Sequence, residues 1–190
     1  MIDGTIGNLG DIPDLSGLSD ETRAPSWDDG WYAGRILEQR SFTDSNGNDR
    51  VFTTEDALSQ NGESRNIRLQ VELTRKSDSR VLNLNTLVNY RLEDLSLETL
   101  QAVAAQQERV RSGEEKTMGN LFRSFMTLLR VGALQRIAGV RQFQRNGNGG
   151  LDLTPIYGKP AYFRIGPDKN EKFKEVKEFN DKVGAKTKVL

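Results

Sequence analysis

Hydrophobic and polar residues alternate most regularly in the stretch RNIRLQVELTR, residues 65–75. Four aliphatic side chains fall on one face of this stretch: Ile67, Leu69, Val71 and Leu73. After a polar turn at residues 76–79, the alternation returns in RVLNLNTLVNYR, residues 80–91. A period of two residues is typical of a β-strand that is buried on one face. The two stretches therefore predict an antiparallel hairpin with one packed face and one solvated face.

A weaker strand pattern precedes this hairpin. Residues 31–42, WYAGRILEQRSF, predict a strand that ends in the turn-forming cluster DSNGND at residues 44–49. Residues 51–54 extend the predicted sheet, whereas residues 55–64 are polar and predict a loop. A second hairpin is predicted near the C-terminus, from PAYFRIG (residues 160–166) and KFKEVKEFN (residues 172–180).

Between the two hairpins the apolar residues change to a helical period. Residues 95–112 predict a helix with Ser96 as its N-cap, and residues 117–139 predict a stronger amphipathic helix that ends at Gly139. The apolar stripe of the second helix is predicted to face the core: Phe122, Phe125, Met126, Leu129, Ala133 and Ile137.

Charge divides the chain into three parts. The whole chain of 190 residues has 27 basic and 27 acidic side chains, and its length suits one domain. Residues 1–30 hold seven acidic residues and one basic residue, so we expect an acidic, flexible N-terminal arm. The domain is expected over residues 31–180, with a helical insert at about 95–139, and residues 181–190 form a basic tail. This asymmetry favours a charged partner such as nucleic acid.

Two residue types are missing, and their absence excludes several chemistries. The chain has no His and no Cys, so it forms no Cys/His zinc site, no His-dependent catalytic triad and no disulfide. No apolar run approaches the roughly 20 residues of a membrane span. We therefore expect a non-enzymatic protein of the cytoplasm, without a metal, a cofactor or a membrane contact.

The predicted order of elements is three β-segments, a helical insert and a β-hairpin, which is the order of a five-stranded OB barrel. Short motifs accompany this order: Trp31-Tyr32-Ala33-Gly34, Leu134-Gln135-Arg136-Ile137-Ala138-Gly139, Leu151-Asp152-Leu153, Tyr157-Gly158-Lys159-Pro160 and the Lys-rich residues 173–179. Over residues 31–180 the chain resembles phage-encoded single-stranded DNA-binding proteins of the OB-fold type and related phage replication-module proteins.

This resemblance implies a mainly β fold with a helical insert, built on an OB-fold-like five-stranded antiparallel barrel. It also implies binding of single-stranded DNA with little sequence preference, which would protect the strand during phage replication or recombination. We expect a homo-oligomer. Residues 1–30 would either recruit replication or recombination proteins, cover the basic groove until DNA displaces them, or serve as a solubilising arm. The long insert and the basic C-terminus depart from the family pattern.

Sequence-tolerant binding of a single strand needs cations along the backbone and flat groups on which bases stack. The candidates are Trp31, Tyr32, Arg68, Arg75, Arg80, Arg91, Tyr162, Arg164, Lys172, Lys174 and Lys177. Tyr162 and Arg164 should share a strand face opposite Phe163, and only one of Trp31 and Tyr32 can point outward. We interpret three other aromatic residues as packing residues: Phe42, Phe52 and Tyr90. A row of asparagines is a minor candidate: Asn83, Asn85 and Asn89.

Two other functions remain open. One is an assembly or protein-interaction module of a phage, which would oligomerise through the Phe/Leu-rich helix. The other is a metal-dependent nuclease, because Pro167-Asp168 followed by Glu175-Val176-Lys177 resembles a P-D…E-x-K pattern. A nuclease requires a metal, whereas binding to a single strand depends on salt and not on Mg²⁺.

Overall fold

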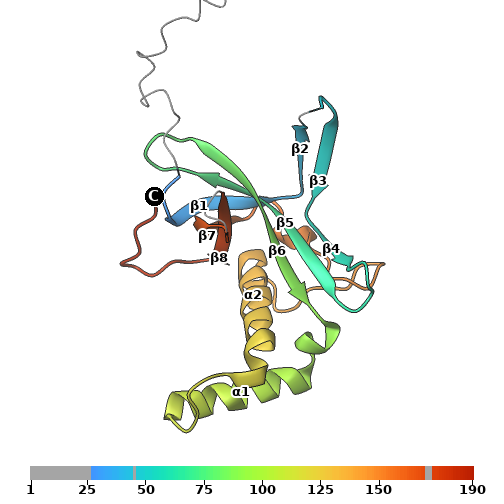
Figure 1. Cartoon of the computed structure of the whole chain (residues 1–190), viewed down its shortest axis with the longest axis vertical. Helices are drawn as coiled ribbons and strands as arrows, with labels where there is room; N and C mark the ends of the chain where they lie inside the picture. Colours follow the sequence, from blue (N-terminus) through green and yellow to red (C-terminus); the bar gives the residue numbers. More distant parts are fainter. Residues whose placement is uncertain (1–26, 45, 170–172) are drawn as a thin grey trace, which may run out of the picture.

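The structure of the chain is a computed structural model that describes residues 27–44, 46–169 and 173–190 (Figure 1). Most of the acidic arm expected over residues 1–30, together with the candidate Lys172, lies outside the described residues. The fold is mainly β, with two helices and an open antiparallel sheet. Within the described part of the chain, no helix combines the length and the apolar character that a membrane span requires.

Eight strands and two α-helices make up the fold. The strands are β1 (Gly30–Leu37), β2 (Gln39–Thr43), β3 (Asp49–Thr53), β4 (Glu55–Leu58), β5 (Arg65–Thr74), β6 (Val81–Tyr90), β7 (Pro160–Pro167) and β8 (Lys174–Asn180). The helices are α1 (Leu97–Ser112) and α2 (Phe122–Ala138). Short 3₁₀ turns lie at Leu92–Leu95, Gly119–Leu121 and Thr154–Ile156.

The main sheet is organised around β5. On one edge β5 pairs with β6 along its whole length. On the other edge its first residues pair with β4 and its last residues pair with β1. β1 also pairs with β7, which pairs with β8, so the strands run β6–β5–β1–β7–β8 across the sheet. β6 and β8, at the two ends of this order, contact each other through close Cα positions.

The core lies between the inner face of this sheet and α2. Alternate residues of β5 are fully buried there, as the period of two predicts: Ile67, Leu69, Val71 and Leu73. Aromatic and aliphatic residues of β1 and β7 join them, among them Tyr32, Ile36, Phe163 and Ile165. Helix α2 contacts β6 and β8 and runs from the sheet to α1 (Figure 1). The opposite face of the sheet, which we call the outer face, carries the polar alternate residues.

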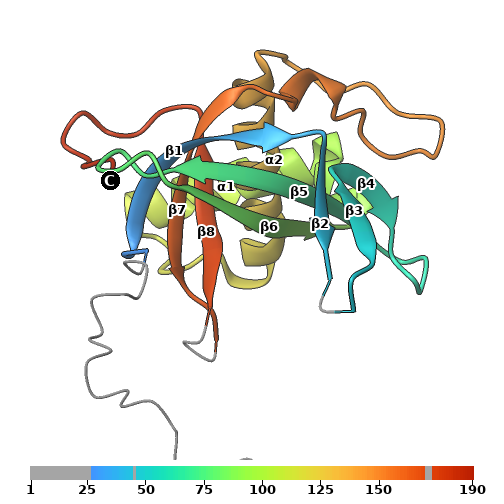
Figure 2. The ribbon, with the colours of Figure 1, turned by 90° about the horizontal axis from the view of Figure 1, so that it is seen from above.

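The two-stranded unit β2–β3, which we call the arm, projects from the sheet on the side opposite α1 (Figures 1 and 2). The strand expected over residues 31–42 is thus divided by a bend at Glu38 into β1 and β2. The predicted turn at residues 44–49 closes the arm, and Gly47 has the positive φ of 79° that a turn of this kind requires.

Several predicted elements are confirmed. The hairpin of residues 65–91 is β5–β6, and the C-terminal hairpin is β7–β8. Ser96 is the N-cap of α1, where its Oγ accepts a hydrogen bond from Thr99 N at 3.1 Å. Gly139 ends α2 with a left-handed conformation. These two capping residues could be predicted from the sequence because a helix cap depends only on residues close to it in the chain.

Two predictions are wrong. The polar segment of residues 55–64 contains the short strand β4, which is held by Asp56, a carboxylate buried beside Arg65. The apolar stripe predicted for the second helix is rotated in the structure. Phe122 and Leu129 are 58% and 47% exposed. Ala133 and Ile137 of the predicted stripe are buried, and Thr127, Val131 and Leu134 complete the buried face of α2.

Candidate nucleic-acid interface

Three of the candidate residues meet on the outer face of β1 and β7. Trp31 is in register with Arg164, and Ala33, the next outward residue of β1, is in register with Tyr162. Their inward neighbours Ala161, Phe163 and Ile165 are buried, as the alternation predicted. We call Trp31, Tyr162 and Arg164 the Trp31 patch. It places two half-buried aromatic rings and one cation on a single surface.

Tyr32 does not belong to this surface. Its side chain is 1% exposed, and its hydroxyl donates a hydrogen bond to the carbonyl of Asp28 at 3.0 Å. The ring packs against Trp27 at 4.9 Å between ring centroids. Tyr32 is therefore the inward member of the Trp31–Tyr32 pair, and its buried ring cannot stack on a base.

Among the described residues, the candidate cations near the Trp31 patch are all ion-paired. Arg164 bonds to Glu178 on β8, and Lys174 bonds to Asp29 at 2.5 Å. Lys177 bonds to Glu175 two residues away on the same strand. These carboxylates are exposed or half-exposed, so each cation remains reachable from solvent.

Two further candidates lie at the β5–β6 turn, which follows Thr74, the residue in register with Ala33. Arg75 is 9% exposed, donates to both carboxylate oxygens of Asp78 at 2.9 and 2.7 Å, and covers the ring of Trp27 at 5.0 Å. The pKa of Asp78 is lowered mainly by this hydrogen bond from Arg75. Arg80 also contacts Asp78, at 3.3 Å. Arg75 therefore fixes the turn, and most of its side chain is covered by Trp27 and Asp78.

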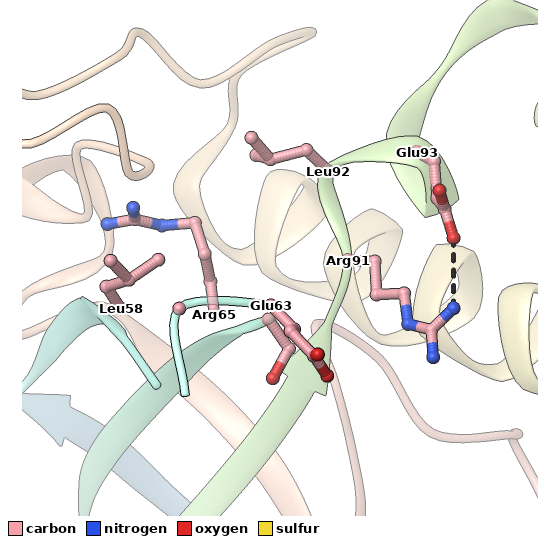
Figure 3. Close-up of a pocket in the computed structure, with 8 residues that line it drawn as sticks. Leu58, Glu63, Arg65, Arg91, Leu92 and Glu93 are labelled. Carbon is pink, nitrogen blue, oxygen red and sulfur yellow. Dashed lines mark hydrogen bonds and ion pairs between the residues drawn. The ribbon is translucent and has the colours of Figure 1, made fainter. Parts of the chain in front are cut away.

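Arg91 lies at the opposite end of β6 from Arg80. A strand of this length spans roughly 30 Å, so the two arginines cannot serve one short site. Arg91 lines a cavity of about 510 Å³ between the β4–β5 turn and the chain after β6, together with Leu58 and Glu63. Its guanidinium points to Glu93 and bonds to it at 3.2 Å (Figure 3). With exposed acidic side chains on its wall, this cavity is a poor site for a phosphate.

The arm presents a face made entirely of arginine and phenylalanine. Arg40 is in register with Phe52, and Phe42 is in register with Arg50. The two phenylalanine rings stack at 4.9 Å with an angle of 14° between their planes, and the guanidinium of Arg40 lies 5.9 Å from both ring centroids. Phe42 and Phe52 are 36% and 39% exposed, so their interpretation as packing residues is wrong.

A cavity of about 300 Å³ lies where the arm meets the outer face of β5 and β6. We call it the arm pocket, and its wall is formed by Phe52, Arg68, Gln70, Asn85, Thr86 and Leu87. Two predicted residues lie on this wall: Arg68, which is exposed and has a long contact of 3.4 Å to Glu55, and Asn85, from the row of asparagines. Arg40 donates a hydrogen bond to Asn85 Oδ1 at 3.3 Å across the junction.

The root of the arm is firmly attached to the sheet by Thr54, which is 1% exposed. Its hydroxyl donates to the carbonyl of Leu37 at 2.5 Å and accepts from the backbone N–H of Gln70 at 2.9 Å. Its carbonyl accepts from the Tyr157 hydroxyl at 3.0 Å. These bonds bridge the point where β5 changes partner from β4 to β1, and they fix the direction in which the arm leaves the sheet.

The residues of the nuclease-like pattern have structural contacts. The backbone N–H of Asp168 donates to the Phe173 carbonyl at 2.8 Å, and its carboxylate accepts from the Phe173 N–H at 3.2 Å. These bonds close the β7–β8 turn. Among residues 27–44, 46–169 and 173–190, no group of three or more acidic side chains is placed to hold a metal ion.

No protein-family model matches this chain, and neither a curated protein nor a solved structure matches it. Any function must therefore be argued from the residues themselves.

Sequence reasoning missed the arm, although a signal was present. Arg40-Ser41-Phe42 and Arg50-Val51-Phe52 have the same spacing on either side of an Asn-Gly turn. In an antiparallel pair this spacing places all four long side chains on one face. No sequence pattern predicted the burial of Gln70. This burial depends on the arm, which covers Gln70 on the polar face of β5.

Proposed function

We propose that this protein binds single-stranded DNA with little sequence preference, through the arm and the outer face of the sheet. The observation that carries this proposal is the Arg/Phe face of the arm. Binding without sequence preference needs cations for the phosphates and aromatic planes for the bases. Arg40, Arg50, Phe42 and Phe52 supply both on a projecting element whose aromatic rings are more than one-third exposed.

The strand order supports an OB-type barrel as the framework for this function. An OB fold consists of a three-strand meander, a helix and a final hairpin, with the first strand between the second and the fourth. The order β6–β5–β1–β7–β8, with α1 and α2 between β6 and β7, is compatible with that arrangement. On this interpretation the arm and β4 are an elaborated loop between the first two barrel strands, and such loops bind single strands in OB folds.

The arm pocket and the Trp31 patch are spaced for a short single strand. Gln70 in the pocket is in register with Leu37, which is six residues from Trp31 along β1. Six residues of a strand span roughly 20 Å. At the roughly 3.4 Å per nucleotide of a base-stacked strand this is at most about six nucleotides, on the order of the 4–16 nucleotides that one OB fold covers.

The ion pairs on the outer face do not prevent phosphate binding. A solvent-exposed ion pair contributes only about 0–1 kcal/mol. A phosphate can therefore replace Glu178 at Arg164, or Glu55 at Arg68, at little cost. The exposed carboxylates weaken the non-specific attraction of the outer face for phosphates. The surface therefore selects its ligand mainly by base stacking.

The experiment is the binding of a fluorescent single-stranded oligonucleotide at two salt concentrations, with matched duplex and RNA as competitors, with and without Mg²⁺. Salt-sensitive binding that the duplex fails to compete away supports the proposal. Absence of binding at low salt rejects it. Degradation of the oligonucleotide only with Mg²⁺ would indicate the nuclease instead.

A second function, assembly with other copies or with a phage protein, is favoured by the apolar surface of the helices. Four exposed side chains carry it: Leu97, Leu100, Phe122 and Leu129. Sedimentation of the double variant Leu97→Gln/Phe122→Gln tests it. A change from oligomer to monomer supports assembly through this surface, and an unchanged sedimentation coefficient rejects it.

We place the DNA-binding function in phage replication or recombination in the cytoplasm of the host, with a homo-oligomer as the active form. The acidic residues 1–30 remain the proposed contact for replication or recombination proteins.

A further inference from the structure

Gln70 in the arm pocket and Arg40 on the adjoining arm each have a buried polar atom that the described part of the protein does not satisfy. Gln70 is 3% exposed and lines the pocket. Within the part of the chain that the structure describes, Gln70 Oε1 and Arg40 Nε are buried and have no hydrogen-bond partner. Most buried polar side-chain atoms in folded proteins have a partner. A buried acceptor and a buried donor are thus both available at the root of the arm.

The surroundings of these atoms restrict the ligand to a small, flat and polar group. Phe52 lines the cavity, and its ring is stacked on Phe42. The cavity of about 300 Å³ lies at the lower limit for small-molecule sites, so it accommodates a compact group. Arg68 on the wall is exposed and can contact an anion attached to that group.

We propose that the arm pocket takes one nucleobase of the bound strand, with the base stacked on Phe52 and its edge bonded to Gln70 Oε1. Every nucleobase edge carries an N–H donor for Gln70 and an acceptor that can receive the Arg40 N–H. The phosphate attached to that nucleotide contacts Arg68. This inference rests on the proposed function and adds to it a defined position at which a base is held.

The pocket explains how the arm could bind without large rearrangement. Thr54 fixes the arm root to Leu37 and to Gln70, so the stacking ring and the acceptor are held in one geometry before a ligand arrives. A preorganised site loses less conformational entropy on binding. Contacts of this kind depend on the base, whereas the cations of the outer face depend only on the phosphates.

The test compares oligo-dT with an abasic oligonucleotide of the same length, which keeps the phosphates and lacks the bases. Phe52→Ala should lower the affinity for oligo-dT roughly tenfold, within the range for loss of one stacked base. Gln70→Leu should lower it by about three- to tenfold. Both variants should bind the abasic strand as the unchanged protein does. Gln101→Leu, an exposed change of the same type on α1, is the control and should alter neither affinity.

An equal loss for both oligonucleotides, or no loss for oligo-dT, overturns the inference. If the unchanged protein binds oligo-dT and the two variants bind equally well, only the pocket is wrong. If the unchanged protein binds no single strand, the proposed function itself fails.

Photocrosslinking of 5-iodouracil strands to the unchanged protein gives a readout that does not depend on variant stability. A crosslink mapped to Phe52, which lines the pocket, supports the inference. Crosslinks confined to Trp31 and Tyr162 overturn it.

Discussion

At the scale of single residues, burial separates side chains that a sequence presents as equivalent. Arg68, Arg75 and Arg164 were all candidates for phosphate contacts. Arg75 is buried against Trp27 and Asp78 and acts in the turn, whereas Arg68 and Arg164 remain exposed. All three have a carboxylate partner, and the distinction comes from Trp27, which is distant in sequence from Arg75 and covers it only after folding.

The Trp31 patch gives a graded prediction. Arg164→Ala should weaken binding of a single strand and flatten its salt dependence, because a phosphate contact is lost. Tyr162→Ala should weaken binding with little change in the salt slope. Glu178→Gln should strengthen binding, because it releases Arg164 from its ion pair. Fluorescence anisotropy titrations at several salt concentrations measure all three. If the three variants bind like the unchanged protein, the Trp31 patch is not part of the interface.

Lys174→Ala belongs to the same series. Lys174 bonds to Asp29, next to Gly30, where β1 begins. Its loss should weaken binding and flatten the slope less than the loss of Arg164, because Lys174 lies at the margin of the patch. An effect larger than that of Arg164→Ala would move the centre of the interface to the β7–β8 turn.

A buried network around Asp56 gives a prediction for stability. The Asp56 carboxylate accepts hydrogen bonds from the Tyr90 hydroxyl at 2.5 Å, from Arg65 at 2.9 Å and from the Leu151 N–H at 2.6 Å. Burial and the neighbouring carboxylate raise the pKa of Tyr90, so its hydroxyl remains a donor. Tyr90→Phe should lower the free energy of unfolding by about 1.5–3 kcal/mol, measured by urea denaturation. Tyr162→Phe, on the outer face, is the control and should change it by less than about 0.5 kcal/mol.

Asp78 gives a prediction for pH dependence. Its pKa is lowered from the usual 3.8, first by the hydrogen bond from Arg75. A carboxyl group whose pKa is lower in the folded state stabilises the fold above its unfolded pKa and loses this contribution as the pH falls through the folded pKa. The thermal midpoint should therefore fall as the pH drops below about 4. Asp78→Asn should have a lower midpoint at pH 7 and a smaller decrease in acid. An equal decrease in both proteins would assign the acid sensitivity to other carboxylates.

At the scale of elements, the regular periodicity of the sequence predicted the structure correctly. Contacts between segments that are distant in the sequence could not be predicted. The β5–β6 hairpin and the caps of both helices follow from local patterns. β4 was missed because its pairing depends on Asp56, whose partners Arg65 and Leu151 come from two other segments. The rotation of α2 was missed because the helix is apolar over much of its surface, and only contact with β6 and β8 selects the buried face.

The arm is predicted to be separable from the rest of the fold. Gln39 and Thr53 are paired at its base, so an Asn-Gly turn can replace residues 40–52. Every residue of β3 is exposed, and the thermal midpoint should therefore change by only a few degrees. The affinity for single-stranded DNA should fall at least tenfold. Differential scanning calorimetry and anisotropy titration measure the two effects. Full affinity in the shortened chain would exclude the arm from the interface.

At the scale of the whole molecule, the absence of net charge limits long-range attraction. The proposed binding would then depend on a few local phosphate contacts, and Arg50, Arg68, Arg164 and Lys174 are among the cations that solvent reaches. For three or four contacts to a single strand, the slope of log K against log salt should be roughly −2 to −3. Titrations between roughly 50 and 300 mM NaCl, where screening changes with salt, measure this slope. A slope near zero would mean that phosphates are not contacted.

The position of β1 has a consequence for how the chain folds. β1 pairs with β5 on one edge and with β7, from near the opposite end of the chain, on the other. The β5–β6 hairpin closes over a short turn, so it can form early, whereas the β1–β7 pairing must wait until residues 160–167 have been synthesised. Pairings between distant segments slow folding, because the entropy cost of closing the loop comes before the stabilisation by the new contacts. Until β7 arrives, one edge of β1 is open to pairing with another chain, and the yield of folded protein should depend on how quickly this edge is covered.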